Sequence, residues 1–369
     1  MVDQSRPQIV YILPNYDPHI GSHFFHVYEL IQAASRDLDI FLVIERAASL
    51  PTDKDIPCYV QRFQSSLLRF FELGFILLRE RFHGRRYFYT HYSFFGGVAS
   101  WLVVRMFGGT AYYWNCGMPW LYRRGKIEEA VFRFVLRHTI FVTGTPGLRD
   151  EYCRHYGLNP VRTRILPNWI HLDRFRQGMD RARARGELGV GDGVKVILFV
   201  HHLSPRKGAH ILPKIMREVL EREKRAMFLI VGDGPEYESL KLQVQSLKFT
   251  ANVRLIGEVA HQEIPKYFWA ADVFLMPSEE EGFPHVLLEA MAVGIPYAAS
   301  DVGGVREITP PVLQEYLVRN GEPHAFGEKI IALLGVWEET RREFARQEHD
   351  WVRGYDLRRV VPVFVSLYR

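Results

Sequence analysis

The feature that most constrains the fold is a stretch in the last third of the chain where strand, turn, helix and strand follow one another. The apolar run 273–276 predicts a buried strand, and an acidic turn that contains Gly282 follows it. A helix is expected from Pro284 to about Gly294, because proline has no N–H to leave unpaired at a first helical position. A second apolar strand is expected at 295–300. Such alternation of strand and helix is typical of parallel α/β sheets.

The turn before this helix is a candidate anion site. The first N–H groups of a helix have no partner within the helix and carry partial positive charge, which suits a phosphate group. Gly282 allows the backbone to approach a ligand closely. Glu289 lies inside the apolar helix, where a charge needs a partner. The alternative is an ordinary strand–loop–helix unit that binds nothing.

Two glutamates, Glu281 and Glu289, are spaced as E-x7-E within a longer pattern of glycine, proline and small residues. The pattern closely resembles that of the retaining, nucleotide-sugar-dependent glycosyltransferases with two Rossmann-like domains (the GT-B fold, family 4). This resemblance implies that Glu289 binds the ribose hydroxyls and that Glu281 lies beside the donor sugar. It also implies that the backbone around Gly282 and Phe283 contacts the sugar. The other matching residues are Ser278, Pro284, Ala290, Met291, Ala292, Gly294, Pro296, Gly303 and Gly304.

Three cationic or titratable positions extend the resemblance. Lys207 matches a lysine that holds the donor diphosphate, where a cation stabilises the charge that develops on the leaving group. The arginine that accompanies this lysine in the family is missing, and we expect His202 or Arg206 to replace it. His91, at the end of an expected strand, matches a histidine that faces the donor sugar. A purely structural histidine is the alternative for His91.

The first loop, residues 14–22, resembles a glycine-rich loop that approaches the donor phosphate and the acceptor in this family. Only Gly21 remains of the family's glycine pair, and a turn glycine without a ligand is the alternative. No metal site is expected, because no further histidine or cysteine near His201 and His202 completes a ligand set.

The fold class predicted is α/β, with two Rossmann-like domains whose parallel sheets face each other across a cleft. A chain of 369 residues is long enough for two domains. We expect an N-terminal, acceptor-side domain at 1–177, a polar linker at 178–193 and a nucleotide-sugar-binding domain at 194–350. A closing helix within 351–369 is expected to return to the first domain.

Two segments of the first domain allow more than one interpretation. Residues 65–81 are apolar on most faces and run into several arginines. They form either an interfacial helix on an anionic membrane or a helix buried beside the sheet, and the buried helix is favoured. Loop 115–124 combines aromatic residues with arginines. It suits contact with the acceptor or anchoring of the loop in the core.

Composition limits the compartment and the partners. Three scattered cysteines indicate a reducing compartment. The polar N-terminus does not resemble a signal peptide, and no uncharged apolar run is long enough to span a membrane. We therefore expect a cytoplasmic protein or one that is peripheral at the inner face of the membrane. The net charge of +5 permits an anionic surface as a partner, whereas the dispersed basic residues argue against nucleic acid.

Together these observations predict a retaining glycosyltransferase of the hexosyltransferase type. It would move a sugar from a UDP- or GDP-sugar to an acceptor hydroxyl in polysaccharide, glycolipid or other glycoconjugate synthesis, with no cofactor required. The acceptor is expected to be a sugar, a lipid-linked sugar or a polysaccharide. The alternatives are a sugar-nucleotide epimerase or hydrolase on a similar fold, and a non-catalytic nucleotide-sugar-binding subunit.

Overall fold

The computed structural model consists of two compact units, which are described separately. The first comprises residues Met1–Pro167 and Leu357–Arg369, and the second comprises Asn168–Asp356. The parts of the chain that the structure describes are residues 6–17, 23–51, 55–176, 179–319 and 321–369.

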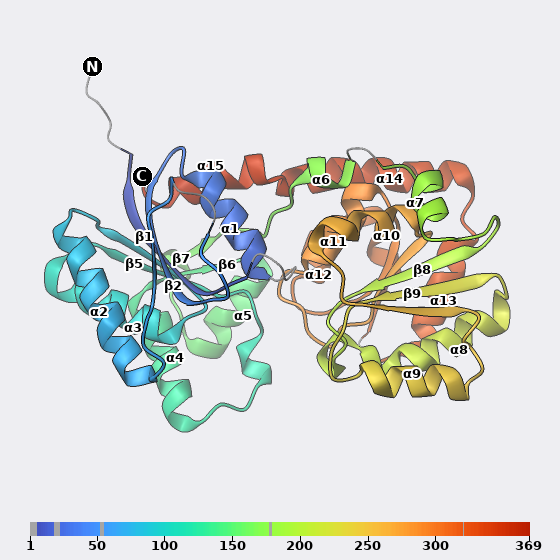
Figure 1. Cartoon of the computed structure of the whole chain (residues 1–369), viewed down its shortest axis with the longest axis horizontal. Coiled ribbons are helices and arrows are strands. Elements are labelled where there is room, and N and C mark those ends of the chain that lie inside the picture. Colours follow the sequence, from blue (N-terminus) through green and yellow to red (C-terminus); the bar gives the residue numbers. More distant parts are fainter. Residues whose placement is uncertain (1–5, 18–22, 52–54, 177–178, 320) are drawn as a thin grey trace, which may run out of the picture. The chain divides into compact units, whose positions relative to one another are not determined.

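The first unit is built on a seven-stranded sheet in the order β3-β2-β1-β4-β5-β6-β7, and every pairing in it is parallel (Figure 1). This order is that of a doubly wound sheet, in which the first strand lies near the middle. Its strands are β1 (Gln8–Tyr16), β2 (Asp39–Ala47), β3 (Cys58–Val60), β4 (Tyr87–His91), β5 (Thr110–Trp114), β6 (Ile140–Thr143) and β7 (Thr163–Ile165). Its helices are α1 (His23–Ala34), α2 (Ser66–Phe82), α3 (Phe94–Phe107), α4 (Lys126–His138), α5 (Pro146–Tyr156) and α15 (Leu357–Ser366).

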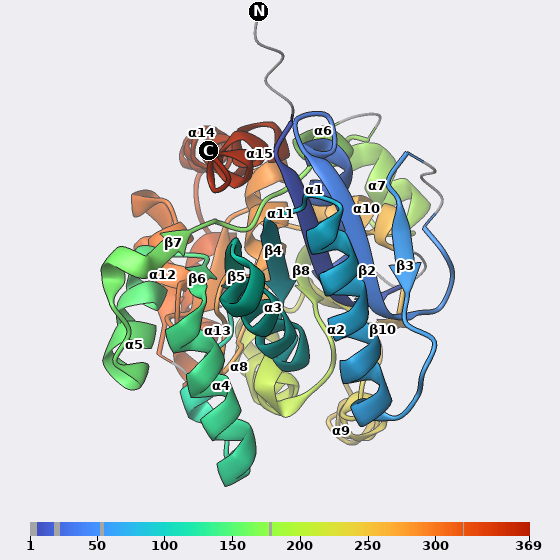
Figure 2. The ribbon, with the colours of Figure 1, turned by 90° about the vertical axis from the view of Figure 1, so that its left-hand side faces the viewer.

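Side chains of the central strands point alternately to the two faces of this sheet, and helices pack on both faces. Val10 of β1 and Phe88 of β4 are fully buried in a core cluster with residues of α2 and α3. Their neighbours Tyr11 and Tyr89 point to the opposite face, where their rings contact Phe364 of α15. Helices α2, α3 and α4 lie side by side over one face in Figure 2. The predicted closing helix is α15, and it packs in the first unit.

The second unit has a six-stranded sheet in the order β10-β9-β8-β11-β12-β13, again with parallel pairings only. Its strands are β8 (Lys195–Val200), β9 (Ala226–Val231), β10 (Val253–Gly257), β11 (Val273–Met276), β12 (Tyr297–Ser300) and β13 (Leu317–Val318). Its helices are α6 (Leu172–Arg176), α7 (Arg181–Glu187), α8 (Leu212–Arg222), α9 (Tyr237–Ser246), α10 (Ile264–Ala270), α11 (His285–Val293), α12 (Val305–Ile308), α13 (Pro323–Leu334) and α14 (Glu338–Val352). Two parallel α/β sheets agree with the predicted fold class.

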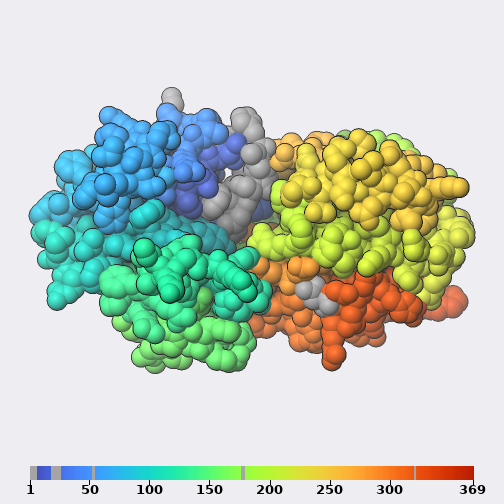
Figure 3. All heavy atoms as spheres, turned by 90° about the horizontal axis from the view of Figure 1, so that it is seen from below, coloured from blue at the N-terminus to red at the C-terminus, as the bar shows by residue number. Residues whose placement is uncertain are grey.

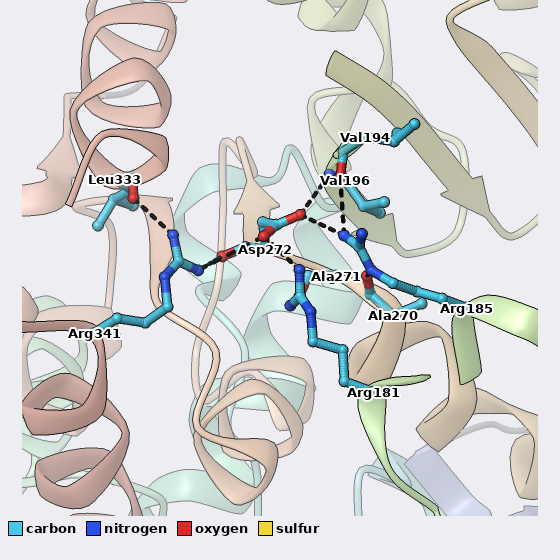
Figure 4. A network of polar contacts seen from close by, with 9 residues as sticks. All are labelled: Arg181, Arg185, Val194, Val196, Ala270, Ala271, Asp272, Leu333 and Arg341. Atoms are coloured by element: carbon cyan, nitrogen blue, oxygen red, sulfur yellow. Dashed lines mark hydrogen bonds and ion pairs between the residues drawn. The ribbon is translucent and has the colours of Figure 1, made fainter. Parts of the chain in front are cut away.

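Residues 181–187 of the predicted linker, 178–193, form helix α7 in the second unit, and a buried carboxylate contacts this helix. Asp272, at the start of β11, accepts hydrogen bonds from Arg181 at 2.6 Å, from Arg185 at 2.7 Å and from the backbone N–H of Val196 at 2.8 Å (Figure 4). Arg341 of α14 donates to the backbone oxygen of Asp272 at 2.9 Å. Three arginines around one carboxylate satisfy a charge that burial alone would disfavour. Arg181 and Arg185 of the predicted linker therefore hold α7 against the start of β11.

The expected helix after the acidic turn is α11, which begins one residue later than predicted, since Pro284 is its N-cap residue. Gly294 ends α11 with a φ of +78°, a left-handed C-cap that glycine adopts without strain. A side chain at Gly294 would also lie 2.8 Å from Cβ of Ala345 in α14. Among the described residues, none of the helices combines the length and apolarity that crossing a lipid bilayer demands.

Candidate active site

The candidate site in the second unit is formed by the loops that follow β8 and β11, neighbouring strands whose carboxyl ends meet at one edge of the sheet. The loop after β8 reaches the loop after β11 because Gly208 has no side chain. A Cβ at Gly208 would lie 2.0 Å from the backbone oxygen of Pro277, and the residue has a φ of +74°. The backbone N–H of Glu279 donates to the backbone oxygen of Arg206 at 2.9 Å. Lys207 thus supplies a positive charge at this point, and Gly208 allows the close contact between the two backbones.

The loop after β9 packs against the same segment through two further glycines. A Cβ at Gly232 would lie 2.0 Å from the backbone oxygen of His201, and one at Gly234 would lie 2.4 Å from that of Leu203. Both glycines have positive φ angles. The backbone N–H of Leu203 completes the contact by donating to the oxygen of Asp233 at 2.8 Å. Three neighbouring loops therefore fix the backbone around His201.

Two side chains contact one carboxylate oxygen of a third. Nζ of Lys207 lies 2.7 Å from Oε1 of Glu281, and Nε2 of His201 lies 3.1 Å from the same oxygen. The side chains of Lys207 and Glu281 are less than one-tenth exposed. The lysine and glutamate predicted from the sequence are therefore in direct contact, although 74 positions separate them.

The tautomer of His201 follows from its two partners. The backbone N–H of His202 can only donate, and it points to Nδ1 of His201 at 3.2 Å. Nδ1 is therefore the acceptor, and the proton of the neutral ring is on Nε2, where it can be donated to Glu281. His202 itself contributes its backbone here, while its side chain is exposed.

The charges in this cluster fix its protonation state. Burial alone would raise the pKa of the Glu281 carboxyl, but the Lys207 ammonium and the hydrogen bond from His201 outweigh it and hold that pKa well below its usual range. Burial and the Lys207 charge lower the pKa of His201 to about 4, against the opposing effect of Glu281. At neutral pH the cluster thus consists of an ammonium, a carboxylate and a neutral imidazole.

Residues elsewhere in the second unit hold the backbone of the predicted sugar-contacting turn around Gly282 and Phe283. The side-chain amide of Asn168 donates to the backbone oxygen of Phe283 at 2.8 Å. The ring of Phe283 packs edge-on against Tyr355, with centroids 5.5 Å apart. Trp169, which stands where the family usually has glycine, is buried and packs edge-on against His285. The departure at Trp169 therefore contributes a packing contact beside the first turn of α11.

Glu289 lies on α11, one helical turn beyond His285, and is buried. No side chain in the described part of the chain caps the N-terminus of α11. The helix thus directs uncapped backbone N–H groups toward the loop that carries Glu281 and Gly282. Arg206, the other expected replacement for the family's arginine, has an exposed side chain.

His91 lies in the first unit, at the carboxyl end of β4, and its surroundings are aromatic. Its ring stacks on Trp114 with centroids 4.0 Å apart, and its Nδ1 lies 3.0 Å from the hydroxyl of Tyr11. Tyr92, the next residue, has a φ of +58°, a left-handed conformation that is strained for a residue other than glycine. Such strain is concentrated at functional sites in proteins. Gly21, the remaining predicted site residue of this unit, lies outside the described residues.

The aromatic loop 115–124 is largely an anchor. The side-chain oxygen of Asn115 accepts hydrogen bonds from the hydroxyl of Tyr152 at 2.7 Å and from the backbone of Gly117 at 2.9 Å. Trp120 stacks on His155, and Arg124 lies over the ring of Phe132. These contacts support the structural interpretation of the loop.

His201 is the site residue that the sequence interpretation missed. In the sequence it stands beside His202, the expected replacement for the family's arginine, and no site role is predicted for His201 itself. One signal was available: His201 directly follows an apolar run that predicts a buried parallel strand, and ligands bind at the carboxyl ends of such strands. Its contact with Glu281 depends on folding and has no local signature.

Comparison with known proteins agrees with the resemblance. Residues 180–351 match the family model described as glycosyl transferases group 1. A D-inositol 3-phosphate glycosyltransferase of Segniliparus rotundus is 31% identical over 267 residues, which cover 69% of this chain and 59% of the relative. One of Geodermatophilus obscurus is 33% identical over 203 residues, covering 52% of this chain and 45% of the relative. The chain thus spans about half the length of these curated relatives.

Two solved structures share the fold along almost the whole chain. Sucrose-phosphate synthase from Thermosynechococcus elongatus has a TM-score of 0.83 at 21% identity, covering 99% of this chain and 98% of that one. Anabaena HepE in complex with UDP has a TM-score of 0.84 at 18% identity, covering 98% of this chain and 99% of that one. These likenesses and the two parallel sheets confirm the predicted GT-B fold class, and residues 180–351 match the model of the glycosyl transferases group 1 family.

Proposed function

We propose that the protein is a retaining glycosyltransferase that moves a sugar from a nucleoside diphosphate sugar to an acceptor hydroxyl. The observation that carries the proposal is the buried cluster of Lys207, Glu281 and His201 beside the uncapped N-terminus of α11. It lies within the residues that match the family model. The names of similar proteins support the same activity: matching relatives are called glycosyltransferases, and HepE was solved with UDP-glucose.

The charges of the cluster suit a diphosphate leaving group. Lys207 is a cation in a mostly buried place, where electrostatic interactions are stronger than in water. In the proposed complex it stabilises the charge that grows on the diphosphate as the sugar leaves. The N–H groups of α11 and of the turn at Gly282 and Phe283 provide further donors for phosphate or sugar oxygens. Exposed Arg206 and His202 are candidates for additional contact with the diphosphate.

Glu281 is assigned to the donor sugar and Glu289 to the ribose. Because the pKa of Glu281 is held well below its usual range, its carboxylate accepts hydrogen bonds and does not act as an acid at neutral pH. Sugar hydroxyls are suitable donors to such a carboxylate. Glu289 has the same chemistry to offer a pair of ribose hydroxyls. His91 and Gly21 of the first unit are proposed to act on the donor side, as the resemblance implies.

Retention of configuration is proposed together with a same-face mechanism, in which the leaving phosphate assists the acceptor hydroxyl. Glu281 is already engaged by Lys207 and His201, which argues against its being the nucleophile of a double displacement. The acceptor proposed is a sugar, a lipid-linked sugar or a polysaccharide.

The experiment that tests the proposal incubates the protein with UDP-, GDP- and ADP-sugars, with and without a mixture of sugar and lipid-linked acceptors. Nucleotide release that requires an acceptor, with the product's anomeric configuration unchanged by NMR, is expected. Release without any acceptor would indicate a hydrolase. A changed sugar without nucleotide release would indicate an epimerase, and binding without turnover would indicate a non-catalytic subunit.

A further inference from the structure

One face of the first unit exposes large apolar side chains on two neighbouring helices. We call this set the apolar face; it consists of Leu67, Phe71, Phe75 and Phe82 of α2 and Phe95 and Met106 of α3. Each of these side chains is at least half exposed, and Phe82 is 70% exposed. Single exposed apolar residues are common, whereas a contiguous apolar patch usually marks an interaction site.

Helical geometry shows that the apolar face is separate from the core. Leu67, Phe71 and Phe75 follow one another at intervals of four, so they form a single stripe on α2. Leu73 and Leu77, on the other side of the same helix, are fully buried in the core cluster beneath α2 and α3. The apolar residues of this helix therefore lie on two sides. One side packs beside the sheet, as the favoured prediction of a buried helix has it, and the other side is exposed to solvent.

The apolar face continues from α2 to α3. The ring of Phe70 contacts Phe71 at 6.0 Å on its own helix and Phe95 of α3 at 6.1 Å. At the other ends of the helices, Phe82 contacts Phe107 at 5.4 Å. The two helices lie side by side in Figure 2, and atoms of this segment form part of the outer surface of the first unit in Figure 3. The apolar face thus extends across both helices.

The segment that carries the apolar face has an excess of positive charge. Residues 62–110 contain seven arginines and two glutamates, and two of these arginines, Arg69 and Arg85, also pair with Glu45 and Asp39 of β2. Glu80 is buried and pairs with Arg79 and Arg85. Glu72 accepts hydrogen bonds from the backbone N–H groups of residues 62 and 63. Both acidic groups are therefore used within the unit.

Three arginines near the C-terminal ends of α2 and α3 form what we call the arginine margin of the face. Arg86 and Arg105 are exposed near the C-terminal ends of α2 and α3. Arg81 joins those ends by donating to the backbone oxygens of Phe107 at 2.5 Å and Gly108 at 2.9 Å. An apolar face of phenylalanine and leucine with an arginine margin is the composition of helices that lie in a bilayer interface.

We infer that the apolar face docks the first unit onto the surface of an anionic lipid bilayer. The phenylalanines would enter the boundary between headgroups and acyl chains, and the marginal arginines would contact lipid phosphates. A second copy of the chain fits less well. In a symmetric pair the same surface meets itself, so both copies would bring the same excess of positive charge to the interface. This inference concerns binding alone and does not depend on the proposed activity.

The test is flotation of the full chain with vesicles of phosphatidylcholine, alone or mixed with phosphatidylglycerol. The apolar variant is Phe71→Ser/Phe75→Ser, and its matched control is Leu242→Ser/Trp337→Ser, which removes two exposed apolar side chains from the second unit. The charge variant is Arg86→Glu/Arg105→Glu, and its control is Lys214→Glu/Arg217→Glu on the exposed side of α8. Circular dichroism and thermal unfolding verify that each variant is folded.

We expect flotation with the anionic vesicles that weakens with salt. Each lost arginine contact should lower the partition coefficient about fivefold, and the apolar variant should lower it at least as much, while both controls behave like wild type. Absence of flotation with anionic vesicles at low salt would overturn the inference. Equal flotation of the variants and controls would also overturn it. Sedimentation that shows a dimer broken by the apolar variant would assign the face to a second copy instead.

Discussion

His91 and His201 lie in comparable places, one in each unit, at the carboxyl end of a central parallel strand. His91 stacks on Trp114 and shares a hydrogen bond with the hydroxyl of Tyr11. His201 instead contacts a carboxylate that also binds an ammonium group. The strand end brings a histidine to the edge where ligands bind, but its neighbours decide what the histidine can do.

The difference bears on which residue carries which chemistry. The cluster around Glu281 has a fixed charge pattern, since a lysine and a neutral histidine hold the carboxylate ionised. In the first unit the ring of His91 is held by stacking on Trp114 and by its contact with the hydroxyl of Tyr11. We therefore expect substitutions near Glu281 to change both turnover and the pH dependence of stability. At His91 the effect on stability and the effect on turnover should be separable.

Replacing Lys207 should have the largest effect. In Lys207→Met the stem is kept and the charge is lost, so kcat should fall by about 10²- to 10³-fold if the ammonium stabilises the leaving group. The buried Glu281 carboxylate would also lose its cation, which should cost about 3–5 kcal/mol of the free energy of unfolding. Donor turnover and urea unfolding measure the two effects.

Two controls separate charge from stability in this experiment. Lys214→Met removes an exposed lysine of α8 and should change neither quantity. The double variant Lys207→Met/Glu281→Gln removes both charges, so it should recover much of the lost stability while remaining inactive. Full activity in stable Lys207→Met would contradict the role given to this lysine.

The His201 cluster should make stability depend on pH in a definite direction. The pKa of His201 is lowered from 6.5 to about 4 in the folded protein, so between these values the unfolded chain binds more protons than the folded one. Stability is therefore fully present above pH 6.5 and is lost as the pH falls toward 4. The contribution is on the order of 3 kcal/mol at 1.36 kcal/mol for each pKa unit.

Urea unfolding of wild type and His201→Gln across this pH range tests the expectation. The difference in the free energy of unfolding between them should grow as the pH rises from 4 to 7. His324→Gln, which replaces an exposed histidine of the second unit, serves as the control for removing a histidine. Parallel curves for wild type and His201→Gln would show that His201 titrates normally.

A smaller effect is expected at His91. His91→Phe keeps an aromatic ring on Trp114 but leaves the buried hydroxyl of Tyr11 without this partner, which should cost about 1–3 kcal/mol of the free energy of unfolding. The double variant Tyr11→Phe/His91→Phe removes both polar groups and should recover most of that stability. If His91 contacts the donor sugar, turnover stays low in the stable double variant. Recovered turnover would leave His91 with a structural role only.

Local patterns in the sequence were sufficient for the fold class, since apolar runs alternate with helical segments in both halves. The family resemblance singled out Lys207 and Glu281, and the structure brings these two side chains into contact. The role of His201 depends on a contact between loops far apart in the sequence, and no local pattern encodes it. The contacts of Arg181 and Arg185 in the predicted linker have no local signature for the same reason: their partner, Asp272, is distant in sequence and buried.

Helix α2 illustrates a further limit. Its sequence is apolar on most faces, which fits both a buried helix and an interfacial helix, with the buried helix favoured. Only the packing of Leu73 and Leu77 against the sheet, with Phe71 and Phe75 left outside, distinguishes the two.

The central claim, that the loops after β8 and β11 bind a nucleotide, is tested most directly by thermal unfolding of wild type and Glu289→Ala with UDP, GDP and ADP. A nucleotide present at ~100 times its Kd should stabilise the folded protein by ~2.7 kcal/mol. We predict that one of the three bases stabilises wild type strongly and Glu289→Ala weakly or not at all. Equal stabilisation of both proteins would contradict the ribose role of Glu289, and no stabilisation of wild type by any of the three would contradict the nucleotide site itself.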